Sequence, residues 1–398
     1  MIKLIRENSV GKSVIILAAV ILAVPGFTGL SIAVDQEDNG IPEWTIALFI
    51  NADNNLEICY DDFTYPWLCA LPDNDEVDIV SWVDRLSTTG YEIIEFSGED
   101  TTISYVETEL GFGLSSTLRD FLIWTNTEHP SENLAVIMWD HGSAWRSFSS
   151  DDTDGSRMYG PDLDQALREA DIPLDILGFD ACSMSSMERL YEVGYSGYVD
   201  IMVASEELVP GNGFPYDLMF TPLIQDSTRA PVQVAGDMVM GWESYYHQSQ
   251  RVNLAAIDVN QFMAAMNSFS DWTDDMIDGI DLFKNAYNHA AKDAYADCGT
   301  QFQLDMIDLA ELLYEELARC PASDERTALS DSTLGLTDAL KGSVIAISTS
   351  AVTRDTHGMT IYWGWYGSWN SFETRYLETL WFPDDTGWGE FLELFNLK

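Results

Sequence analysis

Short apolar runs alternate with amphipathic segments along the chain after residue 40. Runs such as Trp44–Ile50, Asn133–Trp139 and Leu174–Phe179 have the length and composition of buried strands. Between such runs, apolar residues recur at the three- and four-residue spacing of a helix face. Strands that alternate with helices favour a mainly parallel sheet, because each parallel pair needs a crossover that covers one face. The predicted fold class is therefore α/β, with helices on both faces of the sheet.

The remaining elements follow the same two patterns. Further strands are predicted over Tyr91–Phe96, Tyr198–Ser205, Ser343–Ser348 and Met359–Trp363. Helices are predicted where apolar residues recur at helical spacing, and Gly90 ends the first of them. Their apolar faces are Val77, Val80, Val83 and Leu86; Leu114, Leu118, Phe121 and Leu122; Leu163, Ala166 and Leu167; and Met184, Met187 and Leu190. Residues from about 230 to 320 are predicted to be a helical packing region.

The first 33 residues have the pattern of an export signal. Lys3, Arg6 and Lys12 provide a positive start, residues 13–24 are apolar, and Ser31 to Ala33 offers a small-x-small cleavage site. The alternative is an uncleaved membrane anchor, although Pro25 and Gly26 interrupt the apolar run too early for a comfortable span. Residues 34–40 form an acidic linker. We expect a secreted or cell-surface protein, held to a membrane only if this segment is not cleaved.

The charge is strongly negative. Against 19 basic residues stand 66 acidic ones, for a formal charge of −47. Such a surface repels nucleic acid and anionic membranes and attracts cations and basic peptides. Nucleic acid is therefore not an expected partner, and a hydrophobic content of 46% indicates a packed core rather than disorder.

The chain has five cysteines. Cys59 and Cys69 bracket a short loop, and Cys298 and Cys320 bracket an amphipathic segment, so two local disulfides are predicted for an exported protein. Cys182 is left over, and an unpaired thiol in an oxidising compartment is a candidate reactive group. Zinc is disfavoured, because no Cys or His pair has short ligand spacing.

Two of the predicted strands end in residues that can do chemistry. Asn133–Trp139 is followed by Asp140, His141 and Gly142, and Leu174–Phe179 by Asp180, Ala181 and Cys182. If these strands are parallel neighbours, His141 and Cys182 face each other at the carboxyl edge of the sheet, where ligands meet α/β proteins. A thiol beside an imidazole can carry out nucleophilic acyl transfer. The imidazole accepts or stabilises the proton, so that a thiolate is populated near neutral pH. A buried structural cysteine and a hydrogen-bonded structural histidine are the alternative.

At these residues the sequence resembles the clostripain-like cysteine peptidases, relatives of caspases, gingipains and legumains. The resemblance rests on four blocks in order, Trp44 to Glu57, Trp139 to Arg146, Leu174 to Met184 and Ala204 to Tyr216. It implies a caspase-like three-layer fold over residues 41–398 without a separate second module. It also implies Cys182 as nucleophile, His141 as general acid and base, and the N–H groups of Gly142 and Cys182 as oxyanion hole. Relatives have a second glycine where Ser143 stands here.

The resemblance also implies a specificity for Arg or Lys. Asp180 would lie at the base of the pocket for the residue before the scissile bond, and Glu206 and Glu207 could add negative charge there. A helix N-cap is the alternative role for Asp180. Relatives cut themselves after a basic residue between the histidine and the cysteine, which makes Arg157 a candidate processing site.

The other polar groups have simpler interpretations. Asn51, Asp53, Asn54 and Asn55 after the first strand are typical of turns. Asp152, Asp154 and Gly155 partly match a calcium loop, but no glutamate closes it, and a solvated loop is favoured. No cofactor is required by the sequence; calcium, which some relatives use, stays a candidate. His357 precedes a strand and should lie at the opposite edge, and His129, His247 and His289 are expected to be structural.

The predicted function is a secreted cysteine endopeptidase that cleaves after Arg or Lys through a Cys182–His141 dyad. Two alternatives remain at this point: an exported binding or surface protein that keeps the fold without catalysis, and a transpeptidase that passes the acyl group to an amine. The natural substrate and the oligomeric state do not follow from the sequence.

Overall fold

The computed structural model describes residues 40–397, apart from 247 and 299–301. The chain divides into two compact units, residues 1–40 and 41–398. The expected signal peptide lies outside the described residues, and the fold below is that of the second unit. Within the described residues, none of the helices combines the length and the apolar character needed to cross a bilayer.

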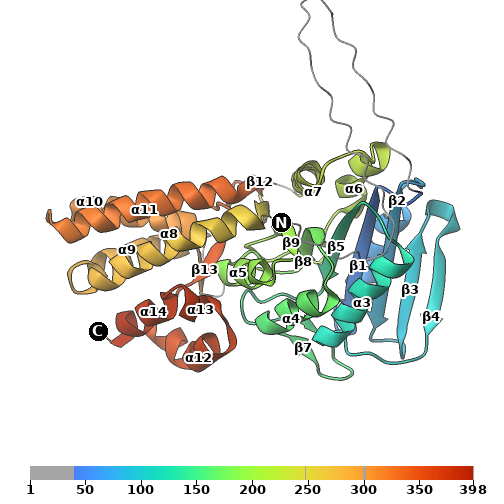
Figure 1. Cartoon of the computed structure of the whole chain (residues 1–398), viewed down its shortest axis with the longest axis horizontal. Coiled ribbons are helices and arrows are strands. Elements are labelled where there is room, and N and C mark those ends of the chain that lie inside the picture. The colour runs from blue at the N-terminus through green and yellow to red at the C-terminus, as the bar shows by residue number, and fades with distance from the viewer. Residues whose placement is uncertain (1–39, 247, 299–301, 398) are drawn as a thin grey trace, which may run out of the picture. The chain divides into compact units, whose positions relative to one another are not determined.

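A nine-stranded sheet forms the centre of this unit (Figure 1), in the order β12-β10-β9-β8-β5-β1-β2-β3-β4. Its strands are β1 (Trp44–Ala52), β2 (Val77–Arg85), β3 (Tyr91–Phe96), β4 (Thr102–Val106), β5 (Asn133–Trp139), β8 (Leu174–Asp180), β9 (Val199–Ala204), β10 (Asn253–Asp258) and β12 (Val344–Thr349). The central strands β9, β8, β5, β1 and β2 are parallel, and antiparallel pairs complete both edges. The predicted α/β fold class is confirmed.

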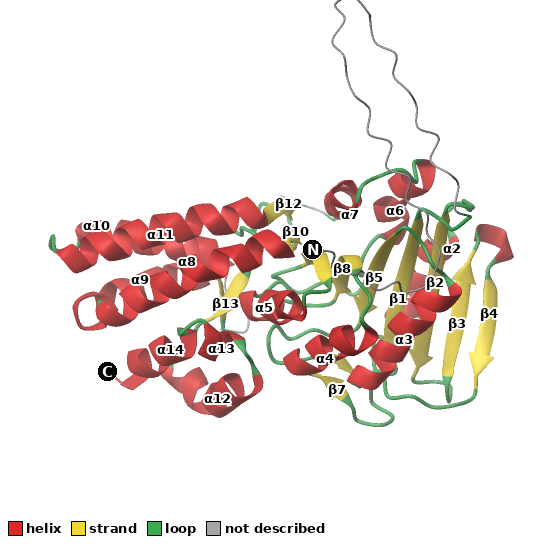
Figure 2. Cartoon of the chain, in the orientation of Figure 1, coloured by secondary structure: helices red, strands yellow, loops and turns green. Residues whose placement is uncertain are grey.

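Helices cover both faces of the sheet, as Figure 2 shows. One face packs on α6 (Tyr216–Gln225) and α7 (Pro231–Tyr245), and the other on α3 (Ser115–Glu128), α4 (Gly160–Ala170), α5 (Met187–Ser196) and α8 (Val259–Asp278). In β1, Ala47 and Phe49 point into one core while Ile46, Leu48 and Ile50 point into the other. Because both faces are covered, the strand is apolar throughout instead of alternating.

The second half of the chain adds a helical region beside the sheet. It contains α8, α9 (Ile280–Cys298), α10 (Met306–Arg319), α11 (Asp324–Ser343), α12 (Tyr366–Thr379), α13 (Phe382–Asp385) and α14 (Trp388–Leu397). A two-stranded sheet of β11 (Gln303–Asp305) and β13 (Thr360–Tyr362) lies among them. Trp272 and Trp388 stack in the core of this region. This core is continuous with the one between the sheet and α5.

Three predicted elements differ from the observed ones. The helix predicted over Val77 to Leu86 is wrong: the segment is strand β2, buried between β1 and β3, so its apolar residues occupy both faces and mimic a helical spacing. The helical region from 230 to 320 also contains β10, an unpredicted strand of the main sheet. Met359–Trp363 is a strand, but it pairs with β11 and does not join the main sheet.

The predicted Cys59–Cys69 disulfide is absent, and both residues carry free thiols. From Cys59 to Cys69 the chain is helical, through α1 (Glu57–Cys59), a wider turn at Tyr60–Thr64 and α2 (Tyr65–Cys69). This separates the two residues by about 15 Å along the helix axis, too far for a disulfide. Cys320 is also a free thiol, and the side chain of its expected partner Cys298 lies outside the described part of the structure.

Candidate active site

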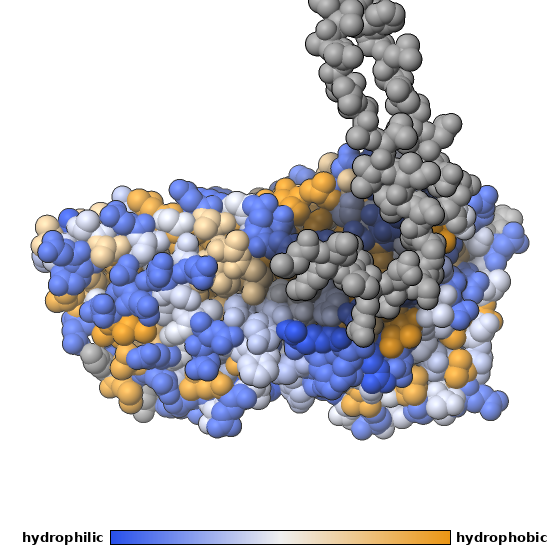
Figure 3. All heavy atoms as spheres, in the orientation of Figure 1, coloured by the Kyte–Doolittle hydropathy of each residue, from blue (hydrophilic) through white to orange (hydrophobic). Residues whose placement is uncertain are grey.

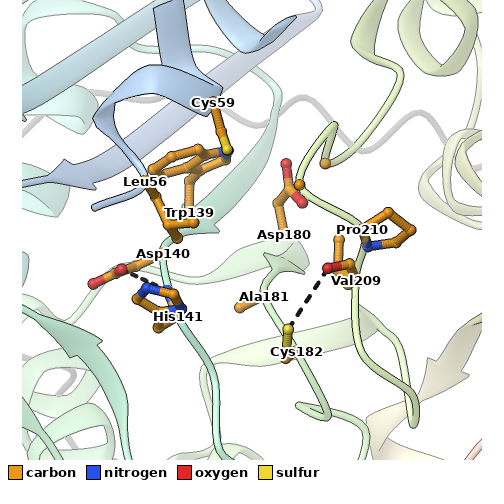
Figure 4. A pocket seen from close by; sticks show the side chains of 12 residues that line it. Leu56, Cys59, Trp139, Asp140, His141, Asp180, Ala181, Cys182, Val209 and Pro210 are labelled. Carbon is orange, nitrogen blue, oxygen red and sulfur yellow. Dashed lines mark hydrogen bonds between the residues drawn. The ribbon is translucent and has the colours of Figure 1, made fainter. Parts of the chain in front are cut away.

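The parallel pairing of β5 with β8 brings the two reactive side chains together. Trp139 lies opposite Asp180 in this register, so His141 and Cys182 leave the sheet from neighbouring strands at the same edge. Both line a cavity of about 160 Å³, and Figure 4 shows their side chains directed to the same space. The cavity is completed by Leu56 and Cys59 on one side and by the Val209–Gly213 loop on the other.

The surroundings of Cys182 favour the neutral thiol over the thiolate. It is partly buried and donates a hydrogen bond to the carbonyl oxygen of Val209 at 3.7 Å, drawn in Figure 4. Burial raises the pKa of Cys182, and the charge of Asp180 raises it further. This direction of shift opposes the expectation of a thiolate populated near neutral pH in the free protein.

The imidazole of His141 is held by an asparagine. Its Nε2 lies 2.9 Å from Oδ1 of Asn55. An amide oxygen only accepts, so Nε2 carries the proton and Nδ1 is the free base. Burial lowers the pKa of His141; the charge of Asp152 partly opposes this shift, and Arg157 adds to it. The site thus contains a neutral imidazole and a neutral thiol, and no hydrogen bond of the described side chains joins the two.

Gly142 allows the histidine loop to pack against the cysteine backbone. A Cβ at this position would lie 3.0 Å from the amide nitrogen of Cys182 and would collide with its carbonyl oxygen. The two expected oxyanion-hole residues are therefore in direct backbone contact. Ser143 then begins a tight turn closed by the bond from its N–H to the carbonyl of Ser147, and the positive φ of 50° falls on Ala144. A second glycine at position 143 is not needed for this turn.

Asp180 lines the same cavity and is only 4% exposed. Its Oδ2 accepts hydrogen bonds from the N–H of Phe214 and the hydroxyl of Tyr216, both at 2.9 Å. Burial nevertheless raises the pKa of Asp180 to about 7. The alternative role as a helix N-cap is wrong, because α5 starts only at Met187 and its N-cap is Ser186.

Gly213 is required beside this carboxylate. It has a φ of +71°, and a Cβ there would lie 2.7 Å from Oδ2 of Asp180. Only glycine combines that backbone conformation with such a close approach. The Val209–Gly213 loop can therefore bring its backbone directly against the acidic end of the cavity.

A second carboxylate, Asp140, joins the loops around the histidine. It is buried and accepts from the N–H groups of His141 and Ser150, both at 2.5 Å, and from Nδ2 of Asn54 at 2.8 Å. Burial raises the pKa of Asp140 to about 8. These bonds fix the start of the histidine loop.

Asn54 and Asn55 were interpreted from the sequence as turn residues only. The structure gives Asn54 a bond to Asp140 and Asn55 a bond to the catalytic-site imidazole. Their place in the chain could have indicated this role. Asn54 and Asn55 follow β1, which pairs in parallel with β5, the strand that ends before His141. The carboxyl ends of neighbouring parallel strands meet at one edge of the sheet.

Glu206 and Glu207 do not add charge to the cavity. Glu207 is buried and forms an ion pair with Arg251 at 2.8 Å. Glu206 is buried as well and accepts bonds from the N–H of Gly358 and the side chain of Asn253. Their partners come from Asn253 at the start of β10, the strand that sequence reasoning missed, from Arg251 just before it and from Gly358.

The remaining candidates lie elsewhere. His357 bonds to Asp305, His129 lies beside Asp78, and His289 lies beside Glu316. His247 is outside the described residues. Arg157 is exposed in the short strand β7 (Arg157–Met158), which pairs with β6 (Phe148–Ser150), and it donates to Ser150. Processing after Arg157 stays a prediction.

Fold and cavity together define a class of protein: a caspase-like α/β protein with a cysteine and a histidine at the carboxyl edge of a mostly parallel sheet. Within this class the chain belongs to the clostripain family, whose model matches residues 48–393. The resemblance inferred from the four sequence blocks is confirmed.

Three relatives illustrate the match. Clostripain of Hathewaya histolytica is 26% identical over 220 residues, which span 44% of this chain and 41% of that protein. A secreted C11 cysteine protease from Bacteroides thetaiotaomicron, solved with an irreversible peptide inhibitor, has a TM-score of 0.63 at 16% identity, over 85% of this chain and 97% of the other. An inactive zymogen C11 protease from Parabacteroides distasonis gives the same TM-score and identity, over 87% and 98%. The two structures establish the fold.

Proposed function

We propose that this protein is a cysteine endopeptidase that hydrolyses peptide bonds after Arg or Lys. Cys182 is the nucleophile, His141 the general acid and base, and the N–H groups of Gly142 and Cys182 form the oxyanion hole. The observation that carries the proposal is that Cys182, His141 and Asp180 line one small cavity. A nucleophile, a base and an acidic specificity group are thus within reach of one substrate residue.

The reaction starts from the neutral pair. As the sulfur of Cys182 attacks the substrate carbonyl, its proton passes to Nδ1 of His141, which Asn55 leaves free. The negative oxygen that forms is stabilised by the two backbone N–H groups. His141 then protonates the departing amine, which leaves a thioester on Cys182. Water attacks this thioester with His141 again as base, and the thiol recovers its proton as the acid product departs.

Specificity comes from the buried carboxylate. Oδ2 of Asp180 is already engaged by Phe214 and Tyr216, and no described group bonds to Oδ1. A guanidinium or ammonium group would meet this oxygen after its methylene chain has passed the apolar walls at Trp139 and Val209. The bound cation would also lower the pKa of Asp180 and hold it ionised.

The test is hydrolysis of fluorogenic peptides with Arg, Lys or a neutral residue before the reporter, on protein lacking residues 1–33. Cys182→Ala should abolish cleavage. Cys59→Ala is the matched control, because Cys59 is a second thiol in the wall of the same cavity and should be dispensable. Cleavage that survives Cys182→Ala, or that is lost in both variants alike, would refute the assigned nucleophile.

We also propose that the protein is exported and that residues 1–33 are removed. The positive start, apolar run and cleavage site support this, as does the solved relative described as secreted. Mass and N-terminal sequence of the protein recovered from its producing cells would test it. A mature chain that begins at Met1 and stays with the membrane would support the anchor instead.

A further inference from the structure

A second cavity adjoins the catalytic histidine. It has a volume of about 150 Å³, and its walls come from the histidine loop and from the β6–β7 hairpin. His141 lines this cavity and also the one that contains Cys182 and Asp180, and the two cavities otherwise have different walls. The imidazole is therefore accessible from two separate spaces.

The two cavities differ in charge. The polar side chains of the second cavity, apart from His141, are the hydroxyls of Ser143, Ser147 and Ser150 and the guanidinium of Arg157, and no carboxylate is part of its described lining. The first cavity contains the carboxylate of Asp180 instead. A positive and a negative space thus adjoin the same histidine, in a chain whose net charge is −47.

The hairpin fixes the place of Arg157. Ser150 lies opposite Arg157 in the pairing of β6 with β7, and its Oγ accepts a hydrogen bond from Nη2 of the arginine at 3.0 Å. The backbone of β7 packs closely on Gly113, where a Cβ would lie 2.5 Å from the backbone nitrogen of Arg157. The N–H of Ser149 donates to the carbonyl of His141 at 3.3 Å. The backbone that carries Arg157 is therefore tied to the histidine loop.

The guanidinium can accept a ligand. Arg157 is exposed, and no carboxylate of the described residues forms an ion pair with it. Asp152 is the competing charge in the hairpin, but it is exposed and does not line the cavity. The charges of Asp152 and Arg157 both act on the pKa of His141, in opposite directions and less strongly than burial. Donors of Arg157 are thus available to a carboxylate that enters the cavity.

We infer that this cavity binds an acidic side chain of the substrate, one of the first two residues after the scissile bond, and that Arg157 selects it. The inference rests on the proposed function. In that reaction the residue before the bond occupies the cavity of Asp180, and His141 protonates the departing amine. The chain beyond this amine therefore continues past the imidazole to the second cavity.

Recognition would use the fork of donors on the guanidinium. Charge-assisted hydrogen bonds from arginine to a carboxylate are stronger than neutral ones and can be bidentate. The hydroxyl of Ser150, which already orients Nη2, holds one side of this fork. The preferred substrate then has a basic residue immediately before the scissile bond and an acidic residue just after it.

The test is the hydrolysis of internally quenched peptides with a single Arg. Asp, Asn and Lys are compared at the first and at the second position after the Arg. All peptides carry uncharged reporters and an amidated C-terminus, so that a side chain is the only carboxylate on that side. Product masses assign the rate to the bond after Arg. At about 0.05 M sodium chloride, where screening is weak, kcat/KM should be about fivefold higher for Asp than for Lys at one or both positions.

A reversal of charge makes the test specific. Arg157→Glu should reverse the order, so that Lys peptides are cleaved faster than Asp peptides. Arg157→Lys keeps the positive charge and the basic residue of the candidate processing site. It should keep the sign of the preference, whether or not the chain is cleaved there.

Arg354→Glu is the matched control, because Arg354 is exposed and lies outside both cavities. It changes the net charge by the same amount and should leave the order of the peptides unchanged. Equal rates for Asp and Lys peptides in the parent, or the same change in Arg157→Glu and Arg354→Glu, would overturn the inference.

Peptide binding to Cys182→Ala protein separates this inference from the proposed function. Fluorescence anisotropy should show tighter binding of the Asp peptide than of the Lys peptide, and the added change Arg157→Glu should reverse this order. Hydrolysis after Arg without any preference in the two following positions would refute the inference and leave the proposed function. The expected order in binding, without hydrolysis by the folded and reduced parent, would refute the proposed function and retain Arg157 as the recognition residue.

Discussion

Asp180 is the residue on which the specificity of the proposed enzyme depends. The resemblance to the clostripain-like peptidases predicts Asp180 in the substrate pocket, and Asp180 lines the same cavity as Cys182 and His141. Its two hydrogen bonds and its pKa of about 7 were not foreseeable. They arise because Phe214 and Tyr216, distant in sequence, close over it.

Asp180→Asn should remove the preference for basic residues. Loss of a charge-assisted bond of about 1.5–3 kcal/mol predicts a 10- to 100-fold fall in kcat/KM for Arg peptides, mainly through KM. The asparagine oxygen can still accept from Phe214 and Tyr216, so the fold should persist. Peptides with a neutral residue are the control and should be cleaved as before. An equal fall for both substrates would show that Asp180 supports the loop instead.

The ionisation of Asp180 also predicts a pH dependence. Its folded pKa is raised to about 7 by burial, so the carboxyl group is neutral below that pH and charged above it. For Arg peptides, KM should therefore fall as the pH rises through about 7. Burial lowers the pKa of His141, so the titration of the imidazole moves to the acidic side of its usual range and away from this step. A pH series from 5 to 9 on the parent and on Asp180→Asn checks this, since the variant should lose the step near pH 7.

At the scale of elements, β10 decides where the acidic residues after β9 point. Asn253, at its start, accepts through Oδ1 from Ser205 and from the N–H groups of Glu206 and Glu207. The carbonyl of Glu207 in turn accepts the N–H of Ser183, next to Cys182. The strand was missed because its apolar run lies within a long stretch of helical periodicity.

Asn253→Ala should destabilise the protein by about 2–4 kcal/mol, because it leaves several buried donors without an acceptor. It should also lower kcat, since the segment that supports Ser183 loosens. Asn260→Ala is the matched control: Asn260 lies just beyond β10 and donates to Asp200 at the surface, so its loss should change stability by less than about 0.5 kcal/mol. Urea unfolding of the two variants makes the comparison, and equal effects would contradict this role of Asn253.

At the scale of the molecule, the dominant feature is the charge of −47. Hydrophilic residues are spread over the visible face in Figure 3, over the sheet as well as the helical region. Like charges at this density repel one another and destabilise the folded state, and salt screens the repulsion.

The melting temperature should therefore rise by about 5 °C or more between 0.05 M and 1 M sodium chloride. Sucrose of equal osmolality, which does not screen charge, is the control for general solute effects. Calorimetry in buffer that contains a chelator excludes a contribution from divalent cations. A melting temperature that is independent of salt would mean that the acidic residues are locally neutralised.

The sequence by itself determined the α/β fold class, most of the central strands, the family and the residues at the strand ends. Parallel strands and right-handed crossovers leave few arrangements, so His141 and Cys182 could be placed at one edge from local patterns. The resemblance to the clostripain-like peptidases also pointed to Asp180, two residues before Cys182.

Tertiary structure alone decided which polar groups meet. Asn55 was brought to His141 and Glu207 to Arg251 by pairings between distant segments. The local sequence shows how buried positions repeat along a strand or helix. It does not show which residue will be the partner across the sheet. The protonation of Cys182 depends on burial and neighbours, which exist only once the chain has folded.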